Sequence, residues 1–170
     1  MGLITPNDFP NLRELYIAQL RYLLSTENQI VKGLPTMIEH AQDPQLKQAF
    51  QSHLQETEGH VTRLQEILGE LDSSDSEKKD PILAAIVGSG EMITKETEEG
   101  PVRDAGLIAT AQKVEHYEMA SYGTARDWAT QLGHTRHAAM LQQTLDEEKH
   151  ADSLLTQISQ RTNTTASRAA

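Results

Sequence analysis

The sequence predicts an all-α fold in which four long helices form two hairpins and an extra short helix crosses from one hairpin to the other. Three observations favour this fold class. Apolar residues recur at helical spacing in four long stretches. Residues that begin and end helices fall between those stretches. Finally, Ala, Leu, Gln, Glu and Lys are common while aromatic residues make up only 4% of the chain, and this composition favours helices over sheets.

The chain has 170 residues, which is most simply one domain large enough to bury a hydrophobic core. We expect the helical bundle to span residues 1–160 and residues 161–170, rich in Thr, Ser and Ala, to form a disordered tail. The formal net charge of -10 argues against a nucleic-acid partner, because phosphate binding needs clustered Lys and Arg. The chain has no Cys, so any metal must be held by oxygen and imidazole ligands.

The sequence also bears on location. No apolar run reaches the length of a membrane span, and residues 1–6 lack a basic segment followed by an apolar core. We therefore expect a cytoplasmic protein with no membrane partner.

The first hairpin is predicted from two sets of helix signals. One helix begins near Pro10–Asn11 and continues at helical spacing to Leu34, and Pro35 is expected to disturb its last turns. A second helix opens at Asp43–Pro44, because Asp is a favourable N-cap and Pro suits the first helical position, and it runs toward Gly69. The connection is short, so these two helices are expected to be antiparallel neighbours.

A polar linker at residues 72–80 separates the two halves of the chain. After it, Pro81–Val87 opens the short crossover helix, and Gly88–Gly90 is expected to interrupt this helix. The bare Gly-Ser-Gly has no third glycine and no preceding strand, so it does not indicate a dinucleotide site.

The second hairpin follows from similar signals. Its first helix starts at Gly100–Pro101 and ends at Gly133, and Thr135 is expected to cap the last helix. An ungapped alignment of Ala49–Ile67 with Met140–Ile158 superposes apolar residues on apolar residues. The second and last long helices are therefore predicted to be counterparts in the two hairpins.

Acidic and histidine side chains interrupt the apolar stripes of all four long helices. A projection at about 100° per residue places Glu27 in the middle of the first stripe and Glu118 and Glu148 in the last two. Glu56 and Asp152 lie at the edges of their stripes. The candidate metal ligands are Glu27, His53, Glu56, His60, Glu115, Glu118, Glu148 and Asp152.

These inward carboxylates require a counter-charge. Burying an unpaired carboxylate costs several kcal/mol, and no Lys or Arg lies on these stripes at the same depth. Glu27 and His60 are separated by the same number of residues as Glu115 and Glu148, so two equal hairpins would bring all four to one level. A pair of metal ions is the simplest counter-charge, and these ligands suit iron or manganese, with zinc as an alternative.

The order of the candidate ligands along the chain follows the pattern of a dimetal helix bundle. In such bundles one Glu from each of two helices joins a Glu-x-x-His pair from each of the other two. The chain holds a literal Glu-x-x-His at Glu147 and His150, but His150 is directed away from the stripe. Ala151 stands three residues after Glu148, where a second His would be expected. The roles of Glu147 and His150 therefore stay open.

Short segments of the chain resemble a known group of proteins. Glu-His-Tyr-Glu at residues 115–118 resembles the third helix of rubrerythrin. Over about residues 7–160 the chain is similar to the small ferritin-like proteins of the YciE/YciF type, in the segments Ser25–Gln29, His53–Thr57, Val102–Ala105, Ala111–Glu118, Ser121–Thr124 and Glu147–Lys149. This resemblance implies a ferritin-like four-helix bundle with a dinuclear iron centre, a homodimer and a role in stress response. It implies no particular reaction.

Two function classes remain open. In the first, the protein is a non-haem diiron metal-binding protein that handles oxygen or peroxide or oxidises iron. The lack of Cys removes the rubredoxin-like electron-transfer module of rubrerythrins, so their peroxidase cycle is not implied. In the second, it is a stress-related structural or interaction bundle in which metal only stabilises the fold. The fold also allows iron storage in a cage, but nothing in the sequence indicates it.

Overall fold

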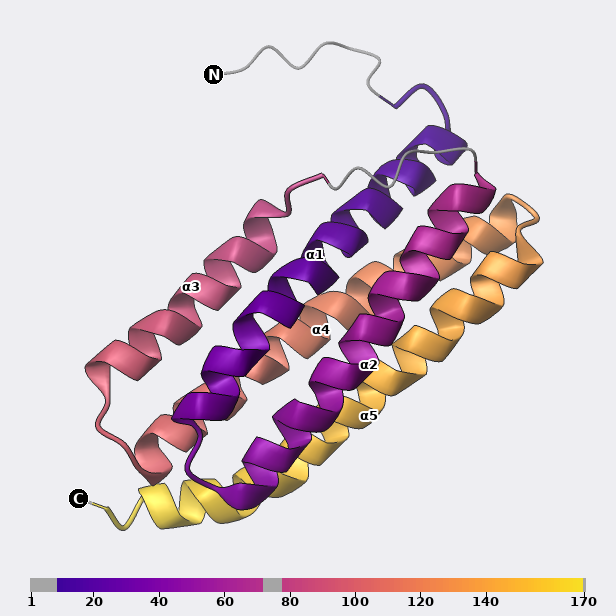
Figure 1. The fold of residues 1–170 in the computed structure, drawn as a ribbon. Coiled ribbons are helices and arrows are strands. Elements are labelled where there is room, and N and C mark those ends of the chain that lie inside the picture. Colours follow the sequence, from indigo (N-terminus) through magenta and orange to yellow (C-terminus); the bar gives the residue numbers. More distant parts are fainter. Residues whose placement is uncertain (1–8, 72–77, 170) are drawn as a thin grey trace, which may run out of the picture.

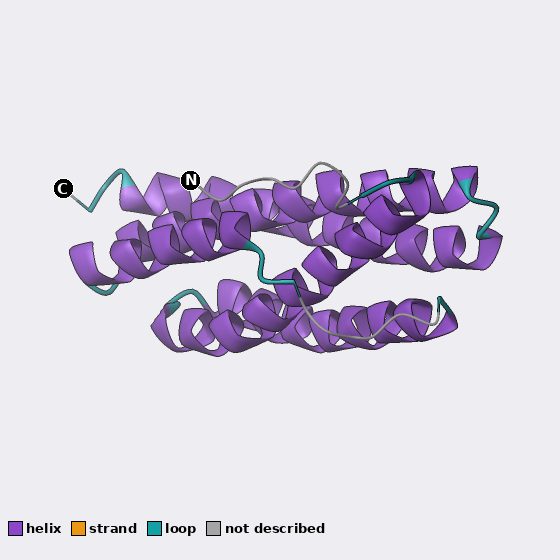
Figure 2. Ribbon diagram, turned by 90° about the horizontal axis from the view of Figure 1, so that it is seen from above, coloured by secondary structure: helices purple, strands orange, loops and turns teal. Residues whose placement is uncertain are grey.

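The computed structural model describes residues 9–71 and 78–169 (Figure 1). These residues form the helices α1 (Leu12–His40), α2 (Pro44–Glu70), α3 (Pro81–Glu96), α4 (Pro101–Gln131) and α5 (Thr135–Ala166). In Figure 2 the described part of the chain contains helices and connecting loops but no strand. The predicted all-α fold with an extra crossover helix is confirmed.

The four long helices pack as two hairpins that lie against each other. α1 packs on α2 and α4 packs on α5, while α1 also contacts α4 and α2 also contacts α5. The shorter α3 lies outside this bundle against α4 and α1 (Figure 1). None of the helices in the described ranges is both long enough and apolar enough to cross a membrane.

Most helix ends lie where local residue chemistry predicts them. The side chain of Asn11 caps α1 by accepting a hydrogen bond from the backbone N–H of Glu14 at 3.0 Å. Asp43 caps α2 in the same way, with Pro at the first helical position. Gly133 has a φ of 78°, a conformation that glycine adopts readily, and it lets the chain turn between α4 and α5. Thr135 differs from its predicted role, because it is the first residue of α5 and not its cap.

The predicted interruption of the crossover helix is wrong. α3 continues without a break through Gly88–Gly90. A Cβ added at Gly90 would lie 2.8 Å from Cγ2 of Thr110 on α4. The glycine therefore serves close packing of α3 on α4, which outweighs its low helix propensity.

The last helix is longer than predicted. α5 extends to Ala166, so residues 161–166 are helical where the composition predicts a disordered tail. Thr162 is buried, and its hydroxyl donates to the backbone oxygen of Ile158 at 3.1 Å. Arg161 forms an ion pair with Asp43 at the start of α2. The burial of Thr162 and the ion pair with Asp43 are tertiary interactions that hold the end of the helix. Residues 72–77 of the predicted linker, residues 1–8 and residue 170 lie outside the described residues.

The apolar core is divided into two clusters along the bundle. One cluster lies near the α4–α5 turn and includes Leu20, Leu64 and Leu145. The other lies near the α1–α2 turn and includes Phe50 and Leu107. Buried polar side chains from the four long helices lie between the two clusters in sequence, so the candidate site occupies the middle of the bundle.

A buried aspartate fixes the start of α3 to the bundle. Asp80 is only 1% exposed and accepts hydrogen bonds from the backbone N–H groups of Ile82 and Leu83, which caps the helix. Its other carboxylate oxygen accepts from the hydroxyl of Thr26 at 2.8 Å and from that of Tyr117 at 2.5 Å. The crossover helix is thus tied to α1 and α4 beside the candidate site.

Candidate metal centre

Six acidic and histidine side chains meet in the middle of the bundle. They come from every long helix, and each is at most 7% exposed: Glu27 of α1, His53 and His60 of α2, Glu115 and Glu118 of α4, and Glu148 of α5. His53 and His60 lie two helical turns apart on α2, which places both imidazoles on the same face.

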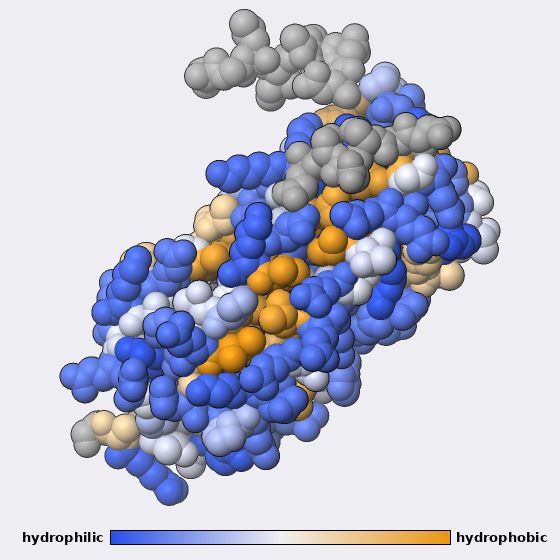
Figure 3. All heavy atoms as spheres, viewed as in Figure 1, coloured by the Kyte–Doolittle hydropathy of each residue, from blue (hydrophilic) through white to orange (hydrophobic). Residues whose placement is uncertain are grey.

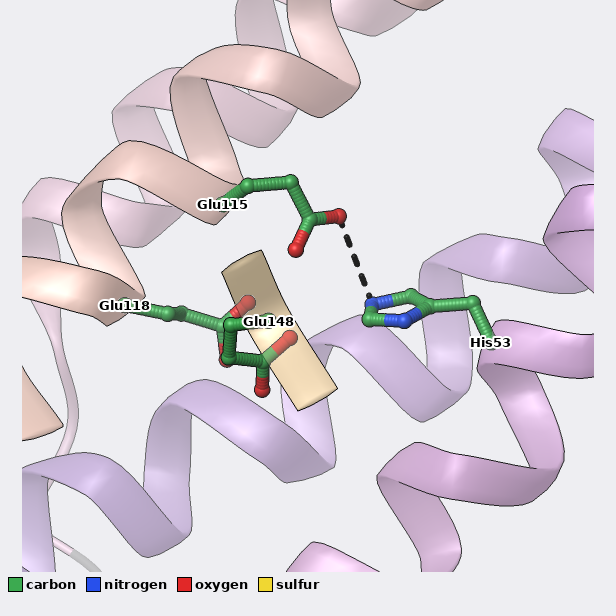
Figure 4. A group of neighbouring side chains, drawn as sticks. All are labelled: His53, Glu115, Glu118 and Glu148. Carbon is green, nitrogen blue, oxygen red and sulfur yellow. Dashed lines mark ion pairs between the residues drawn. The ribbon is translucent and has the colours of Figure 1, made fainter. Parts of the chain in front are cut away.

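These side chains form two groups that share one residue. Ligand atoms of His53, Glu115, Glu118 and Glu148 all lie within 4.8 Å of one another. Figure 4 shows the three carboxylates and the imidazole of this group directed toward a common space. Ligand atoms of Glu27, His60 and Glu148 form a second group under the same limit. Glu148 belongs to both groups, which is the position of a bridging carboxylate.

The first group is dominated by carboxylates that burial makes hard to ionise. Nε2 of His53 lies 3.5 Å from Oε1 of Glu115, the contact dashed in Figure 4. Burial raises the pKa of Glu118 well above its ordinary value, and the negative charge of Glu148 raises it further. Burial likewise raises the pKa of Glu115. Burial alone would lower the pKa of His53, but the carboxylates of Glu115, Glu56 and Glu148 together more than offset this and raise it to about 9.

The second group surrounds His60. Its Nδ1 lies 3.0 Å from Oε1 of Glu148 and 3.5 Å from Oε1 of Glu27. Burial would lower the pKa of His60, but these two carboxylates raise it to about 10. The hydroxyl of Tyr122 donates a hydrogen bond to Oε1 of Glu27. Burial also raises the pKa of Glu27, although His60 and Tyr122 oppose that shift.

Outer residues hold the imidazole of His60 from its far side. Nε2 of His60 lies 3.0 Å from Oε2 of Glu147. Arg63 binds both oxygens of Glu147, at 2.6 and 2.9 Å. The sequence leaves the role of Glu147 open, and it gives no role to Arg63 because this residue lies outside the apolar stripe. The sequence does contain a signal for a role of Arg63. Arg63 stands three residues after His60, so the two side chains lie close together on the surface of α2.

Two of the predicted ligands lie outside the cluster. The side chain of Glu56 is 42% exposed and lies at the edge of the centre, with Oε2 3.9 Å from Nδ1 of His53. Asp152 accepts a hydrogen bond from Gln112 at 3.2 Å and lies 3.3 Å from Nε2 of His116. The structure therefore brings together the other six predicted ligands and leaves Asp152 in a polar contact between α4 and α5.

Several buried polar atoms of the centre lack hydrogen-bond partners. Both carboxylate oxygens of Glu118 and of Glu148 are buried without one, as are Oε2 of Glu27 and Oε2 of Glu115. Such atoms are costly in a protein interior unless a cation or a donor satisfies them. Carboxylate oxygens with two imidazoles are ligands that suit iron, manganese and zinc. The residues present thus fit a pair of metal ions.

Comparison with known proteins gives a consistent family assignment. Residues 11–169 match the family model described as a domain of unknown function (DUF892). The chain is 36% identical over 148 residues to Protein YciF of Escherichia coli (strain K12), an alignment that covers 86% of this chain and 89% of that protein. The crystal structure of the E. coli stress protein YciF superposes with a TM-score of 0.87 at 35% identity, covering 91% of this chain and 98% of that one.

Two further solved structures share the fold. YcfI from Rhodopseudomonas palustris, whose description proposes a structural role for it, superposes with a TM-score of 0.86 at 35% identity, covering 90% of this chain and 98% of that one. A protein from Xanthomonas campestris pv. campestris superposes with a TM-score of 0.76 at 19% identity, over 91% of this chain and 95% of that one, which shows the fold alone. Because the family match spans nearly the whole chain, the protein belongs to the DUF892 family.

Proposed function

We propose that this chain binds a pair of metal ions, iron in the first place, between the two hairpins of the bundle. The observation that carries the proposal is the set of buried carboxylate oxygens without hydrogen-bond partners. Glu148 would help to hold both ions, because it belongs to both groups of ligand atoms. His53, Glu115 and Glu118 would hold one ion with it, and Glu27 and His60 would hold the other.

The proposed activity is the handling of oxygen or peroxide, or the oxidation of iron, during stress. A pair of iron ions, when bound, would supply electrons to an oxidant. All six ligands are buried, and the hydroxyl of Tyr122 donates a hydrogen bond to Oε1 of Glu27. The stress role is supported by the similarity to YciF, which is described as a stress protein. We further propose a homodimer, in line with the family resemblance of the sequence, and a cytoplasmic location, in line with its lack of membrane-length apolar runs.

Metal content and reactivity test this function together. Protein produced with added iron should contain about two metal ions per chain by elemental analysis, the number held by dimetal helix bundles. After anaerobic reduction, the ferrous iron measured with a colorimetric chelator should fall within minutes of adding oxygen or peroxide. Less than a tenth of an equivalent of any transition metal would refute the proposal.

A second candidate function is a structural bundle in which metal only stabilises the fold. The similarity to YcfI favours this candidate, because a structural role is proposed in that protein's description. The same reactivity experiment separates the two candidates. If the bound iron of metal-loaded protein stays ferrous for hours in air, the structural role is favoured.

A further inference from the structure

A cavity of about 380 Å³ lies in the half of the bundle nearer the α1–α2 turn. Residues from all five helices line it, and its wall is mainly apolar, with Ile30, Leu34, Phe50, Leu107, Val114 and Leu155 among the lining residues. This volume lies within the range of small-molecule sites in proteins. The cavity is therefore large enough for an organic ligand.

One end of the cavity reaches the candidate metal centre. His53 and Glu115 both line it and are only 7% and 3% exposed. Nδ1 of His53 and Oε2 of Glu115 have no hydrogen-bond partner. These two buried polar atoms require a partner, and the adjoining space is large enough to supply one from a ligand.

The other end of the cavity lies at the protein surface between α1 and α3. Lys32 and Thr36 of α1 and Glu91 of α3 line this end and are exposed. Figure 3 shows a band of hydrophobic atoms along α1 on the same face of the molecule. Gly33 and Gly90, which also line the cavity, contribute no side chains to its wall. A ligand could therefore enter between these two helices without crossing the closely packed bundle.

We propose that this cavity binds an unbranched primary alcohol, with its aliphatic chain along the apolar wall and its hydroxyl between His53 and Glu115. A hydroxyl both accepts and donates a hydrogen bond, so it can satisfy both unpaired atoms. A carboxylate head group accepts hydrogen bonds but donates none, so it would leave Oε2 of Glu115 unpaired. The inference goes beyond the proposed metal function and does not depend on it.

Calorimetric titration of chelator-treated protein with 1-decanol tests the proposal. We expect saturable binding of one molecule per chain. Decanoate should bind at least about tenfold more weakly, because its carboxylate leaves the buried oxygen of Glu115 without a hydrogen-bond donor. Absence of saturable 1-decanol binding would refute the cavity as a ligand site, and tighter binding of decanoate would refute the neutral head group.

Variants that fill the cavity give a second test. Ala111→Phe on α4 and the milder Ala151→Leu on α5 each place a larger side chain in the lining and should weaken 1-decanol binding by roughly tenfold or more. Ala120→Phe, the same change at an exposed position of α4, is the matched control and should bind as the parent does. Circular dichroism melting checks that each variant folds. Unchanged binding by a folded cavity variant would overturn the proposal.

The metal content of the same samples keeps this test separate from that of the proposed function. Protein that binds 1-decanol but no transition metal would refute the metal function and leave the cavity inference standing. Protein that binds metal but not 1-decanol would refute the cavity inference and leave the metal function standing.

Discussion

Nε2 of His60 lies 3.0 Å from Oε2 of Glu147, and this contact sets which nitrogen of His60 faces the buried carboxylates. Partial burial of Glu147 opposes its ionisation, but Arg63, Gln143 and His60 together more than offset this and hold the pKa of Glu147 below its ordinary value. An ionised Glu147 accepts a hydrogen bond from the protonated Nε2. Nδ1 is then left to face Glu27 and Glu148, where it would be free to bind the proposed metal.

Replacing Glu147 should therefore weaken metal binding without removing a ligand. We expect Glu147→Ala to lower metal affinity by about 10–100-fold, the usual effect of losing a carboxylate that orients a ligating His. The number of ions bound at saturation should not change. Competition with a chelator of known affinity measures the effect, and Glu58→Ala, at an exposed position of α2, is the matched control. Equal affinities for the two variants would contradict the orienting role.

Glu118 and His116 lie on the same helix but should differ in their effect on metal content. Glu118 is fully buried with both oxygens unpaired, whereas the side chain of His116 is 66% exposed. Glu118→Ala should lose at least one metal ion per chain and keep its helical circular dichroism signal. His116→Ala should retain the metal content of the parent. Elemental analysis after saturation and gel filtration checks both, and a similar loss from the two variants would show that the ligands are assigned wrongly.

Without metal, the stability of the protein should fall as pH rises from 6 to 9. Nearby carboxylates raise the pKa of His53 to about 9 and that of His60 to about 10, although burial opposes both shifts. The folded chain then binds more protons than the unfolded chain. This stabilisation is fully present below the unfolded His pKa of about 6.5 and is lost progressively as the pH rises through the folded pKa values of about 9 and 10. The raised pKa values of Glu115 and Glu118 act in the same direction.

Thermal unfolding with excess chelator measures this dependence. The melting temperature should be several degrees lower at pH 9 than at pH 6. Metal-loaded protein should lack this fall, because bound metal requires deprotonated ligands. A metal-free protein that melts higher at pH 9 would contradict the clustering of these groups.

The packing of α3 on α4 depends on a glycine. A Cβ added at Gly106 would collide with Cγ2 of Ile93 on α3, whereas one added at Gly123, also in α4, would meet no atom within 4 Å. Gly106→Ala should lower the free energy of unfolding by about 1–3 kcal/mol. Gly123→Ala should raise it by about 0.4–1 kcal/mol, because it restricts the unfolded chain. Urea denaturation compares the two variants. If both substitutions raise the free energy of unfolding, α3 can move away from residue 106 without cost, and the close packing does not depend on the glycine.

Several features of this fold could be read from short segments of sequence. The starts of α1 and α2 lie at Asn11 and Asp43 as predicted, because cap chemistry acts within one helical turn. The continuity of α3 through Gly88–Gly90 and the extension of α5 beyond Arg161 could not be predicted in this way. Both depend on contacts with residues distant in the chain, such as Thr110 and Asp43.

The candidate site also has some features that the sequence predicts and others that only the tertiary structure determines. The burial of Glu27, Glu118 and Glu148 could be predicted, because the helical period determines which side chains lie on an apolar stripe. The sharing of Glu148 between two groups, and the support of His60 by Glu147, could not. These relations depend on the axial alignment of α5 against α2, and that alignment is set by side-chain packing along the whole bundle, which no local pattern records.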